Sequence, residues 1–233
     1  MQITPRLWQL KMGNVNAYLL KSTDGLVLVD AGWPHKADTL FELVQKAGHS
    51  PADIRHLVLT HGHIDHAGSA AEVKRRTGAR VYAHAADIDL ITKGEAEHPG
   101  TTVTPGIIPA LLNLIFIKPG GTKYEALSVD QTLEDGEMLP MVKDVQIIHT
   151  PGHSAGHIAL LMQQDGVLIA GDICSNVMGL GYSILNEDRA LARRSILHVA
   201  TYPFEKAVFG HGSALTKRAN QALKEKFLNI ESK

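Results

Sequence analysis

Residues 60–68 read Thr-His-Gly-His-Ile-Asp-His-Ala-Gly and follow directly on the apolar run 57–59. A short apolar run of this kind is typical of a strand buried on both faces. Four potential metal ligands then fall within six residues: His61, His63, Asp65 and His66. Packing does not explain the cluster, because burying such groups without partners would cost several kcal/mol. The spacing therefore predicts a metal site at the end of a strand.

Further candidate ligands stand just beyond three other apolar runs. His153 lies shortly after the run 145–148, Asp172 after 167–170, and His211 after 207–209. Glycines adjoin most of them, as expected where the backbone turns sharply. Taken singly, Asp172 or His211 would more often be a structural polar residue than a ligand. Strand ends at one sheet edge can converge, however, as they do in the ligand pockets of α/β proteins. We therefore expect these side chains to join the cluster.

The resulting ligand set favours two metal ions. It holds five histidines and two aspartates and no cysteine: His61, His63, Asp65, His66, His153, Asp172 and His211. Such ligands suit zinc, and also iron, manganese or cobalt. Seven ligands are too many for one tetrahedral ion, but they suffice for two ions that share one carboxylate. Two ions ~3.5–4 Å apart can hold a hydroxide between them. We predict two divalent ions per chain, with Zn²⁺ preferred over Mn²⁺, Fe²⁺ or Co²⁺.

Apolar runs alternate with helical patterns along most of the chain, which predicts a layered α/β architecture. Strands are expected at 26–29, 57–59, 79–83, 145–148, 158–162, 167–170 and 207–209, and helices at 35–47, 67–77, 85–92, 187–200 and 213–228. Residues 94–121 differ, because four prolines and several glycines surround an apolar middle there. We interpret them as an insertion in a single domain that spans residues 1–233.

Composition limits the classes of function. The formal net charge is −1 and there is no long Lys/Arg run, so nothing favours nucleic acid. The longest dense apolar stretch, residues 107–117, is shorter than the ~20 residues of a membrane-spanning helix. The N-terminus lacks the pattern of a secretory signal. A single cysteine, Cys174, excludes an internal disulfide and is interpreted as a small buried residue. We expect a cytoplasmic protein that acts on a small molecule, without nucleic-acid or membrane partners.

The string at 60–68 resembles the signature motif of the metallo-β-lactamase superfamily. His153, Asp172 and His211 match its later ligand motifs in order, and Asp30 in the sequence Val-Asp-Ala-Gly is similar to its first motif. The resemblance spans residues 26–212. It implies an α/β fold of the four-layer αββα sandwich type, with the metal site at the edge between the two sheets.

The resemblance also implies a role for each matching position. His61, His63 and His153 would hold the first metal, Asp65, His66 and His211 the second, and Asp172 would bridge both. Asp65 would in addition be catalytic, because it would orient the attacking hydroxide and accept its proton. Asp30 would hydrogen-bond near the ligand loop and fix its geometry. His157 resembles a frequent family pattern, and we interpret it as structural or supporting.

The implied reaction is hydrolysis by a metal-bridging hydroxide, and the substrate is open among esters, lactones and thioesters. Asp172 argues against a dedicated β-lactamase, which usually lacks the bridging aspartate, although promiscuous β-lactam cleavage is compatible. Glyoxalase II-like thioesterases share the aspartate but have a helical C-terminal region, whereas 22 residues follow His211 here. Lactonases often place a tyrosine where this chain has Ser175. Tyr182 could approach the site from the same loop or could equally pack in the core.

Two alternative functions stay open beside this hydrolase: a mononuclear-iron dioxygenase of the persulfide dioxygenase type, and a β-lactamase. Metal content separates the first, since a dioxygenase would hold one iron where the hydrolase holds about two zinc ions. The apolar middle of the insertion, residues 107–117, also has three interpretations. It could roof a pocket for an acyl chain, form a homodimer contact, or be a helix packed on its own core. Gel filtration of a variant without this segment tests the homodimer.

Overall fold

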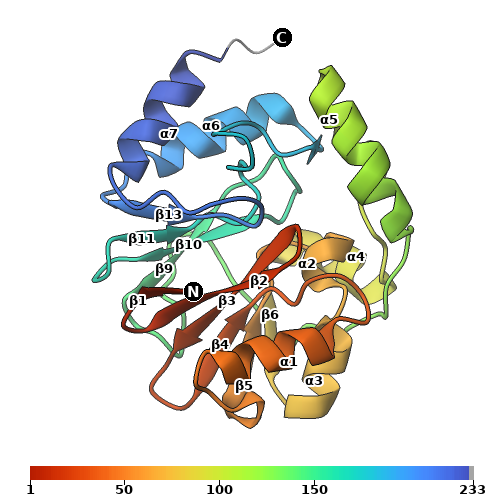
Figure 1. Cartoon of the computed structure of the whole chain (residues 1–233), viewed down its shortest axis with the longest axis vertical. Coiled ribbons are helices and arrows are strands. Elements are labelled where there is room, and N and C mark those ends of the chain that lie inside the picture. The colour runs from red at the N-terminus through yellow and green to blue at the C-terminus, as the bar shows by residue number, and fades with distance from the viewer. Residues whose placement is uncertain (231–233) are drawn as a thin grey trace.

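The computed structural model describes residues 1–230; residues 231–233, the end of the expected domain, lie outside the described residues, as does the side chain of Phe116. Two β-sheets pack face to face in the middle of the molecule (Figure 1). Within residues 1–230 the first sheet has seven strands, in the order β1 (Gln2–Thr4), β2 (Leu7–Met12), β3 (Val15–Lys21), β4 (Leu26–Val29), β5 (Ile54–Val58), β6 (Arg80–Ala83) and β8 (Gln131–Thr132). In the same part of the chain the second has four, in the order β13 (Lys206–Val208), β11 (Val167–Ile169), β10 (Ile158–Met162) and β9 (Val145–His149).

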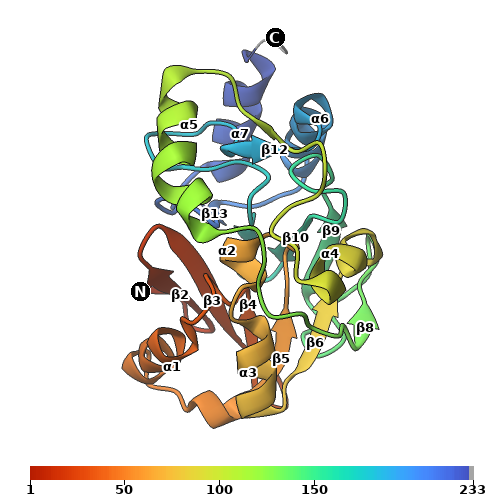
Figure 2. The same ribbon diagram turned by 90° about the vertical axis from the view of Figure 1, so that its right-hand side faces the viewer.

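Helices cover the outer face of each sheet. The helices α1 (Ala37–Lys46) and α3 (Ala70–Thr77) lie against the first sheet, and α6 (Arg189–Val199) and α7 (Ala219–Leu228) lie against the second (Figure 1, Figure 2). Short helical turns occupy several connections: η1 (Pro51–Asp53), α2 (Ile64–Ala67), η2 (Ala85–Asp87) and α4 (Ile88–Lys93). The order of layers confirms the αββα sandwich expected from the sequence.

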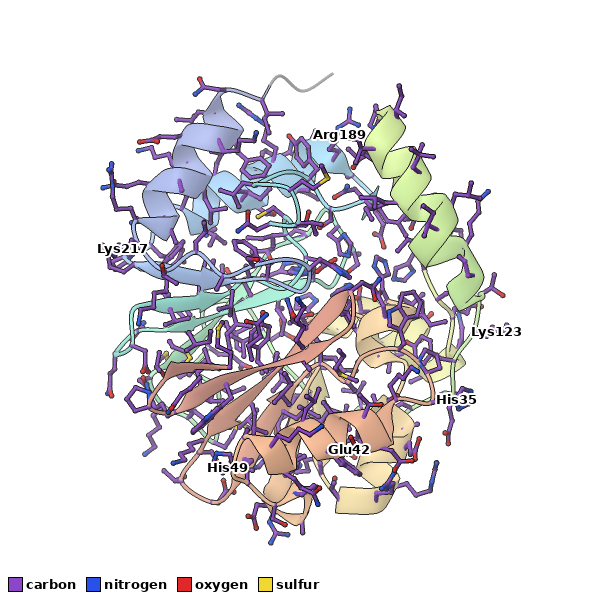
Figure 3. All side chains as sticks on the ribbon, in the orientation of Figure 1. His35, Glu42, His49, Lys123, Arg189 and Lys217 are labelled. Atoms are coloured by element: carbon purple, nitrogen blue, oxygen red, sulfur yellow. The ribbon has the colours of Figure 1, made fainter. Side chains whose placement is uncertain are left out.

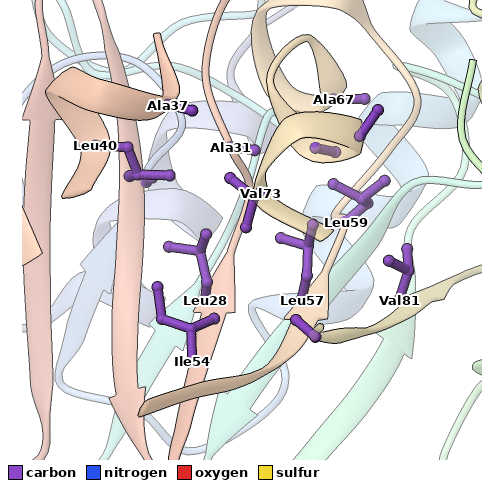
Figure 4. Packing of buried hydrophobic residues seen from close by; sticks show 14 of the residues in the cluster. Leu28, Ala31, Ala37, Leu40, Ile54, Leu57, Leu59, Ala67, Val73 and Val81 are labelled. Atoms are coloured by element: carbon purple, nitrogen blue, oxygen red, sulfur yellow. The ribbon is translucent and has the colours of Figure 1, made fainter. Parts of the chain in front are cut away.

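Three apolar layers hold these elements together, because side chains along a strand point alternately to its two faces. Leu28 in β4 faces the helices α1 and α3, and Figure 4 shows it packed with Leu40 and Val73. Its neighbour Val29 faces the other way and packs with Leu160 of β10 between the sheets. A third layer joins the second sheet to α6 and α7. Each of the five residues of β10 is buried, which explains why the run 158–162 is apolar throughout.

Two predicted helices differ most from the structure in their bounds. The segment 67–77 is divided into α2 and α3, and α3 ends as expected at Gly78, whose φ of 71° is favourable for glycine. The helix expected from Ser213 begins instead at Ala219. The residues before it pair with β13, since Leu215 and Ala207 exchange two backbone hydrogen bonds of 2.8 and 2.9 Å. Pairing at the sheet edge therefore prevails over helix propensity here.

The strands β1, β2 and β3 were not predicted from the sequence. β2 and β3 form an antiparallel hairpin in which Met12 lies opposite Val15, so that a Gly-Asn pair makes the turn. That pair is a hairpin signal. It was concealed because Gln9 and Asn16 are polar and yet buried, 7% and 3% exposed, and so interrupt the apolar pattern.

The insertion stands away from the body of the molecule. It contains β7 (Thr102–Val103), α5 (Ile107–Leu112), the π-helical turn η3 (Asn113–Ile117) and η4 (Lys118–Gly120). β7 pairs with β12 (Leu185–Asn186), which anchors one end. No residue of α5 is buried, so the interpretation as a helix packed on its own core is wrong. Side chains project from both sides of this green segment in Figure 3. Neither α5 nor any other helix within residues 1–230 is long and apolar enough to cross a membrane.

Candidate metal centre

The predicted ligands follow the carboxyl ends of four strands and meet in one cluster. His61 and His63 lie in the loop after β5, and Asp65 and His66 lie on the short helix α2 that begins after His63. The remaining three follow β9, β11 and β13, respectively: His153, Asp172 and His211. One of these strands, β5, belongs to the first sheet and the other three belong to the second, so the cluster joins both sheets. The structure brings all seven predicted side chains together.

The first group within the cluster is formed by three histidines. Ligand nitrogens of His61, His63 and His153 lie within 4.8 Å of one another. All three side chains are buried. The Nε2 atoms of His61 and His153 are 3.1 Å apart. Three ring nitrogens at these distances surround a position that one cation can occupy.

The second group consists of Asp65, His66 and His211, whose ligand atoms also lie within 4.8 Å of one another. His211 Nε2 is 3.1 Å from Asp65 Oδ2. Asp172 stands between the two groups: its Oδ2 is 3.3 Å from His211 Nε2 and 3.7 Å from His153 Nε2. Asp172 therefore lies within reach of ligand atoms of both groups.

Asp30 orients two of the histidines, as expected. It accepts hydrogen bonds from His66 Nδ1 (2.8 Å) and from the Thr60 hydroxyl (2.8 Å). Because that hydroxyl donates to Asp30, its oxygen accepts from His61 Nδ1 at 2.9 Å. Asp30 has a φ of 62°, an uncommon conformation that its side chain contacts over-determine. Both rings are thereby held with Nε2 towards the cluster.

Backbone carbonyls orient two more rings. His153 Nδ1 donates to Leu185 O at 2.8 Å, and His211 Nδ1 donates to Asn14 O at 2.7 Å. Asn14 belongs to the β2–β3 turn, and the neighbouring Asn16 donates from Nδ2 to Phe209 O at 2.9 Å. These Nδ1 contacts fix the ring orientations, so Nε2 of each ring is directed at the cluster, with a free lone pair on the neutral His153. The 3.1 Å approach of the His61 and His153 Nε2 atoms is therefore a meeting of two lone pairs.

The pKa values of the side chains differ between the two groups of the cluster. Burial, together with the charge of His153, lowers the pKa of His63 to about 3, so its ring is neutral. Burial also disfavours a charge on His66, but Asp65 and Asp172 outweigh it and raise the pKa of His66 to about 9. Burial opposes ionisation of Asp65, yet His66 and His211 lower its pKa to about 2. Without a metal, histidine protons balance the buried carboxylates; a divalent cation would replace those protons.

Unpartnered polar atoms test whether a metal fits. Among the described residues, His63 Nε2, His66 Nε2 and Asp172 Oδ1 are buried without a hydrogen-bond partner. Such atoms are rare, because each costs free energy unless something binds it. A β-carbon at position 210 would collide with Asp172 Oδ1, so glycine is required there. Neutral imidazoles and carboxylates with open lone pairs fit a divalent cation, and the cluster is able to hold metal ions.

Three other residues noted in the sequence have clear places. His157 is a supporting residue: Nδ1 donates to Thr150 Oγ1 at 2.7 Å, and Nε2 accepts from the Asp172 backbone N–H at 2.9 Å. Cys174 is fully buried in the third apolar layer, and burial raises the pKa of its thiol. Tyr182 packs against Phe227 with ring centroids 5.3 Å apart, and it also lines the cavity beside the cluster.

Asp87 was missed in the sequence. Its side chain is fully buried and accepts three hydrogen bonds, from Gly62 N (2.8 Å), Ser154 Oγ (2.8 Å) and Gly156 N (2.6 Å). Burial raises its pKa, but these bonds and the nearby His98 outweigh burial and lower the pKa to about 2. In the sequence Asp87 reads as an ordinary acid at the start of a helix. No spacing relates it to the ligands, so pattern alone could not find it.

A cavity of about 490 Å³ opens on the cluster. His63, Asp65, His153, Asp172 and His211 line one side of it. The other walls are mostly apolar side chains from two segments, α5 with η3 and the loop 177–185: Ile108, Leu112, Ile117, Val177, Leu180 and Ile184. Its volume lies in the range of small-molecule sites, roughly 300–1,000 Å³.

Comparison with known proteins identifies the family. The family model described as "Metallo-beta-lactamase superfamily" matches residues 10–211. The chain is 27% identical to "Probable metallo-hydrolase YflN" of Bacillus subtilis (82% of this chain, 76% of that protein). It is 25% identical to "Hydroxyacylglutathione hydrolase GloC" of Haemophilus influenzae (79% and 82%). It spans 66% of the length of two further curated relatives.

A solved structure supports the same conclusion at the level of the fold. The crystal structure of BJP-1, a subclass B3 metallo-beta-lactamase of Bradyrhizobium japonicum, superposes with a TM-score of 0.74 at 21% identity. The superposition covers 99% of this chain and 89% of that one. The family model extends over most of the length of this chain, and the αββα layers agree with that match. The chain therefore belongs to the metallo-beta-lactamase superfamily.

Proposed function

We propose that this metal-dependent hydrolase cleaves an ester, thioester or lactone whose acyl part is an uncharged aliphatic chain. One observation carries the proposal: the cavity of about 490 Å³ is lined by the histidine–aspartate cluster and otherwise by mostly apolar side chains, with Lys11, Asn14 and Asn16 among the polar exceptions. A polar reacting group at one end and an apolar tail at the other match these walls. The relative named as a hydroxyacylglutathione hydrolase supports a thioester among the candidates.

The seven side chains would hold two divalent ions, with zinc as the first choice. His61, His63 and His153 would bind one, Asp65, His66 and His211 the other, and Asp172 both. When bound, the ions would lower the pKa of water towards about 7 and polarise the substrate carbonyl. The protein supplies neutral imidazoles on one side and ionised carboxylates on the other, as their pKa values indicate.

The chain's own residues would position the reactants. Asp65 lines the cavity and is ionised, so its carboxylate can orient the nucleophilic water and accept its proton. His211 Nε2 lies 3.1 Å from Asp65 Oδ2, so the same ion would hold both side chains and fix that carboxylate. Leu112 and Ile117 on the opposite wall would exclude bulk water and bury the acyl chain. The walls thus combine a polar reaction centre with an apolar tail site.

Acyl chain length gives the direct test of the substrate class. With p-nitrophenyl esters from acetate to decanoate, we expect kcat/KM to rise about fourfold for each methylene until the cavity is filled. The reason is that burying a CH₂ group contributes about 0.8 kcal/mol, and about 1.4 kcal/mol is tenfold. Leu112→Ser, on the cavity wall, should flatten this rise and leave acetate hydrolysis unchanged.

Leu111 provides the matched control, because it is on the same helix, 51% exposed, and does not line the cavity. Leu111→Ser should keep the full dependence on chain length. A shift of this variant to a smaller size in gel filtration would instead assign the outer face of α5 to a homodimer. Equal kcat/KM for acetate and decanoate esters in the unmodified protein would refute the aliphatic substrate, and no turnover of any ester, thioester or lactone would refute the hydrolase mechanism.

Metal content separates the hydrolase from the iron dioxygenase. We expect about two zinc ions per chain in protein purified without added metal, because the cluster offers two groups and a shared carboxylate. Elemental analysis by mass spectrometry measures this ratio directly. One iron per chain, with oxygen consumption on a persulfide substrate, would contradict the proposal and favour the dioxygenase.

A further inference from the structure

Asp87 connects two loops that belong to different sheets. One loop follows β5 and contains Gly62, and the other follows β9 and contains Ser154 and Gly156. Asp87 itself lies in η2, after β6, and takes no place among the seven candidate ligands. Its two carboxylate oxygens accept from both loops: Oδ2 from Gly62 N and Ser154 Oγ, and Oδ1 from Gly156 N.

These contacts lie beside the first group of ligands. Gly62 is between His61 and His63 in the sequence, and Ser154 directly follows His153. The three histidines come together only across the two loops, so the distance between the loops sets the distance between their nitrogens. One backbone hydrogen bond, from Ile158 N at the start of β10 to Thr60 O at 2.8 Å, also links these segments. Asp87 joins them next to the ligands themselves.

The fit around Asp87 is close. A β-carbon at position 156 would lie 2.6 Å from Asp87 Oδ1 and from its backbone nitrogen, so the loop approaches here only because the residue is glycine. All three groups that meet the carboxylate are donors. An ionised carboxylate has acceptor capacity alone, whereas an asparagine amide would place its NH₂ against at least one of these donors. The three donors therefore require a carboxylate here.

The second group of ligands is held by other residues. His66 is fixed by Asp30 and His211 by the carbonyl of Asn14, at 2.8 and 2.7 Å. Asp87 hydrogen-bonds to neither of them. The two groups thus have separate supports, although they share Asp172.

We propose that Asp87 is a positioning residue that sets the geometry of the three-histidine group, and that the second group does not depend on it. Residues that orient ligands without binding the metal typically contribute 10- to 100-fold to metal affinity. A change at Asp87 should therefore lower the affinity for the ion in the three-histidine group by this factor and leave the affinity for the other ion unchanged. This role for Asp87 rests on the two-metal assignment under the proposed function. The metal-release experiment distinguishes a failure of this role from a failure of that assignment.

The test uses the zinc-loaded full chain and Asp87→Asn. Zinc is withdrawn with a graded chelator, and the cobalt form is followed by its visible absorption. In the unmodified protein two ions should leave. In Asp87→Asn one of them should leave at a 10- to 100-fold lower chelator concentration, with a changed cobalt spectrum for that ion, while the second is unchanged. Ser154→Ala, which removes one of the three bonds, should show the same one-ion effect more weakly and decides the matter if Asp87→Asn does not fold.

Asp130→Asn is the matched control. Asp130 Oδ2 accepts a backbone hydrogen bond from Val81 N at 2.8 Å, also beside β6, but it contacts Lys74 rather than a ligand loop. The Asp130→Asn variant should lose thermal stability and keep both ions. Equal loss of both ions in Asp87→Asn, or retention of both with an unchanged cobalt spectrum, would overturn the proposal. Release of a single ion from the unmodified protein would instead refute the two-metal assignment.

Discussion

Replacing Asp172 with alanine is expected to remove bound metal and hydrolytic turnover together. Asp172 is buried, and its carboxylate lies 3.3 Å from His211 and 3.7 Å from His153, so it is the group that both halves of the cluster share. Its loss would take a negative charge from both proposed ions at once. We expect metal content to fall below about one ion per chain and kcat to fall by about 10³-fold or more, as when a main electrostatic group is removed from an active site. Elemental analysis and ester hydrolysis on the same sample measure both.

Cys174 gives the control for this substitution. It is buried two positions further along the same loop and packs in the third apolar layer. Cys174→Ala should keep the metal and the turnover, with a moderate loss of stability from the vacated volume. Hydrolysis that persists in metal-free Asp172→Ala would show that the reaction needs neither this carboxylate nor the ions.

Chelation is expected to lower the melting temperature by roughly 8–16 °C. Ions that bind the folded state alone stabilise it by about 4 kcal/mol at 1,000 times Kd, and each kcal/mol corresponds to about 2–4 °C for a chain of this size. The carboxylates of Asp65 and Asp172 are buried within the cluster, so removing the cations leaves them balanced by histidine protons alone. Thermal unfolding with and without chelator measures the difference.

The difference should widen as the pH rises from about 6.5 to 9. In the metal-free protein the pKa of His66 is raised to about 9, so its proton stabilises the fold fully below the unfolded value of about 6.5. That contribution is lost as pH rises through about 9. Metal binding strengthens over the same range, because fewer protons compete for the ligands. A gap that narrows with rising pH would contradict the assignment of His66 as a ligand.

The sequence revealed the candidate ligands because their signals are local. The spacing of His61, His63 and His66 directly after an apolar strand needs no knowledge of the tertiary structure. His153, Asp172 and His211 could be added because each follows a strand, and strand ends converge at sheet edges. Their supports could also be anticipated where a motif carries them, as Asp30 does: its hydrogen bonds to Thr60 and His66 agree with the expected role.

The rest depends on contacts between distant residues. Asp87 acts on Gly62 and Gly156, 25 and 69 positions away, and nothing near it in the sequence marks that role. The strands β1–β3 escaped prediction because their buried polar residues bind other segments: Asn16 donates to the carbonyl of Phe209. Likewise, the apolar run at 107–117 could not show on which side α5 would face the body. In each case the deciding energy comes from tertiary packing.

The β2–β3 hairpin has a consequence for how genes of this kind are delimited. Translation that started at Met12 would produce a chain with all seven candidate ligands and no β1 or β2 beyond a single residue. Asn14, whose carbonyl orients His211, would then stand at a free end instead of in a turn. A survey that counted ligand motifs would score the shortened product as intact. In that product the turn that presents the Asn14 carbonyl to His211 would be lost, so the orientation of His211 would no longer be fixed. The first eleven codons are therefore needed for the geometry of the candidate metal centre.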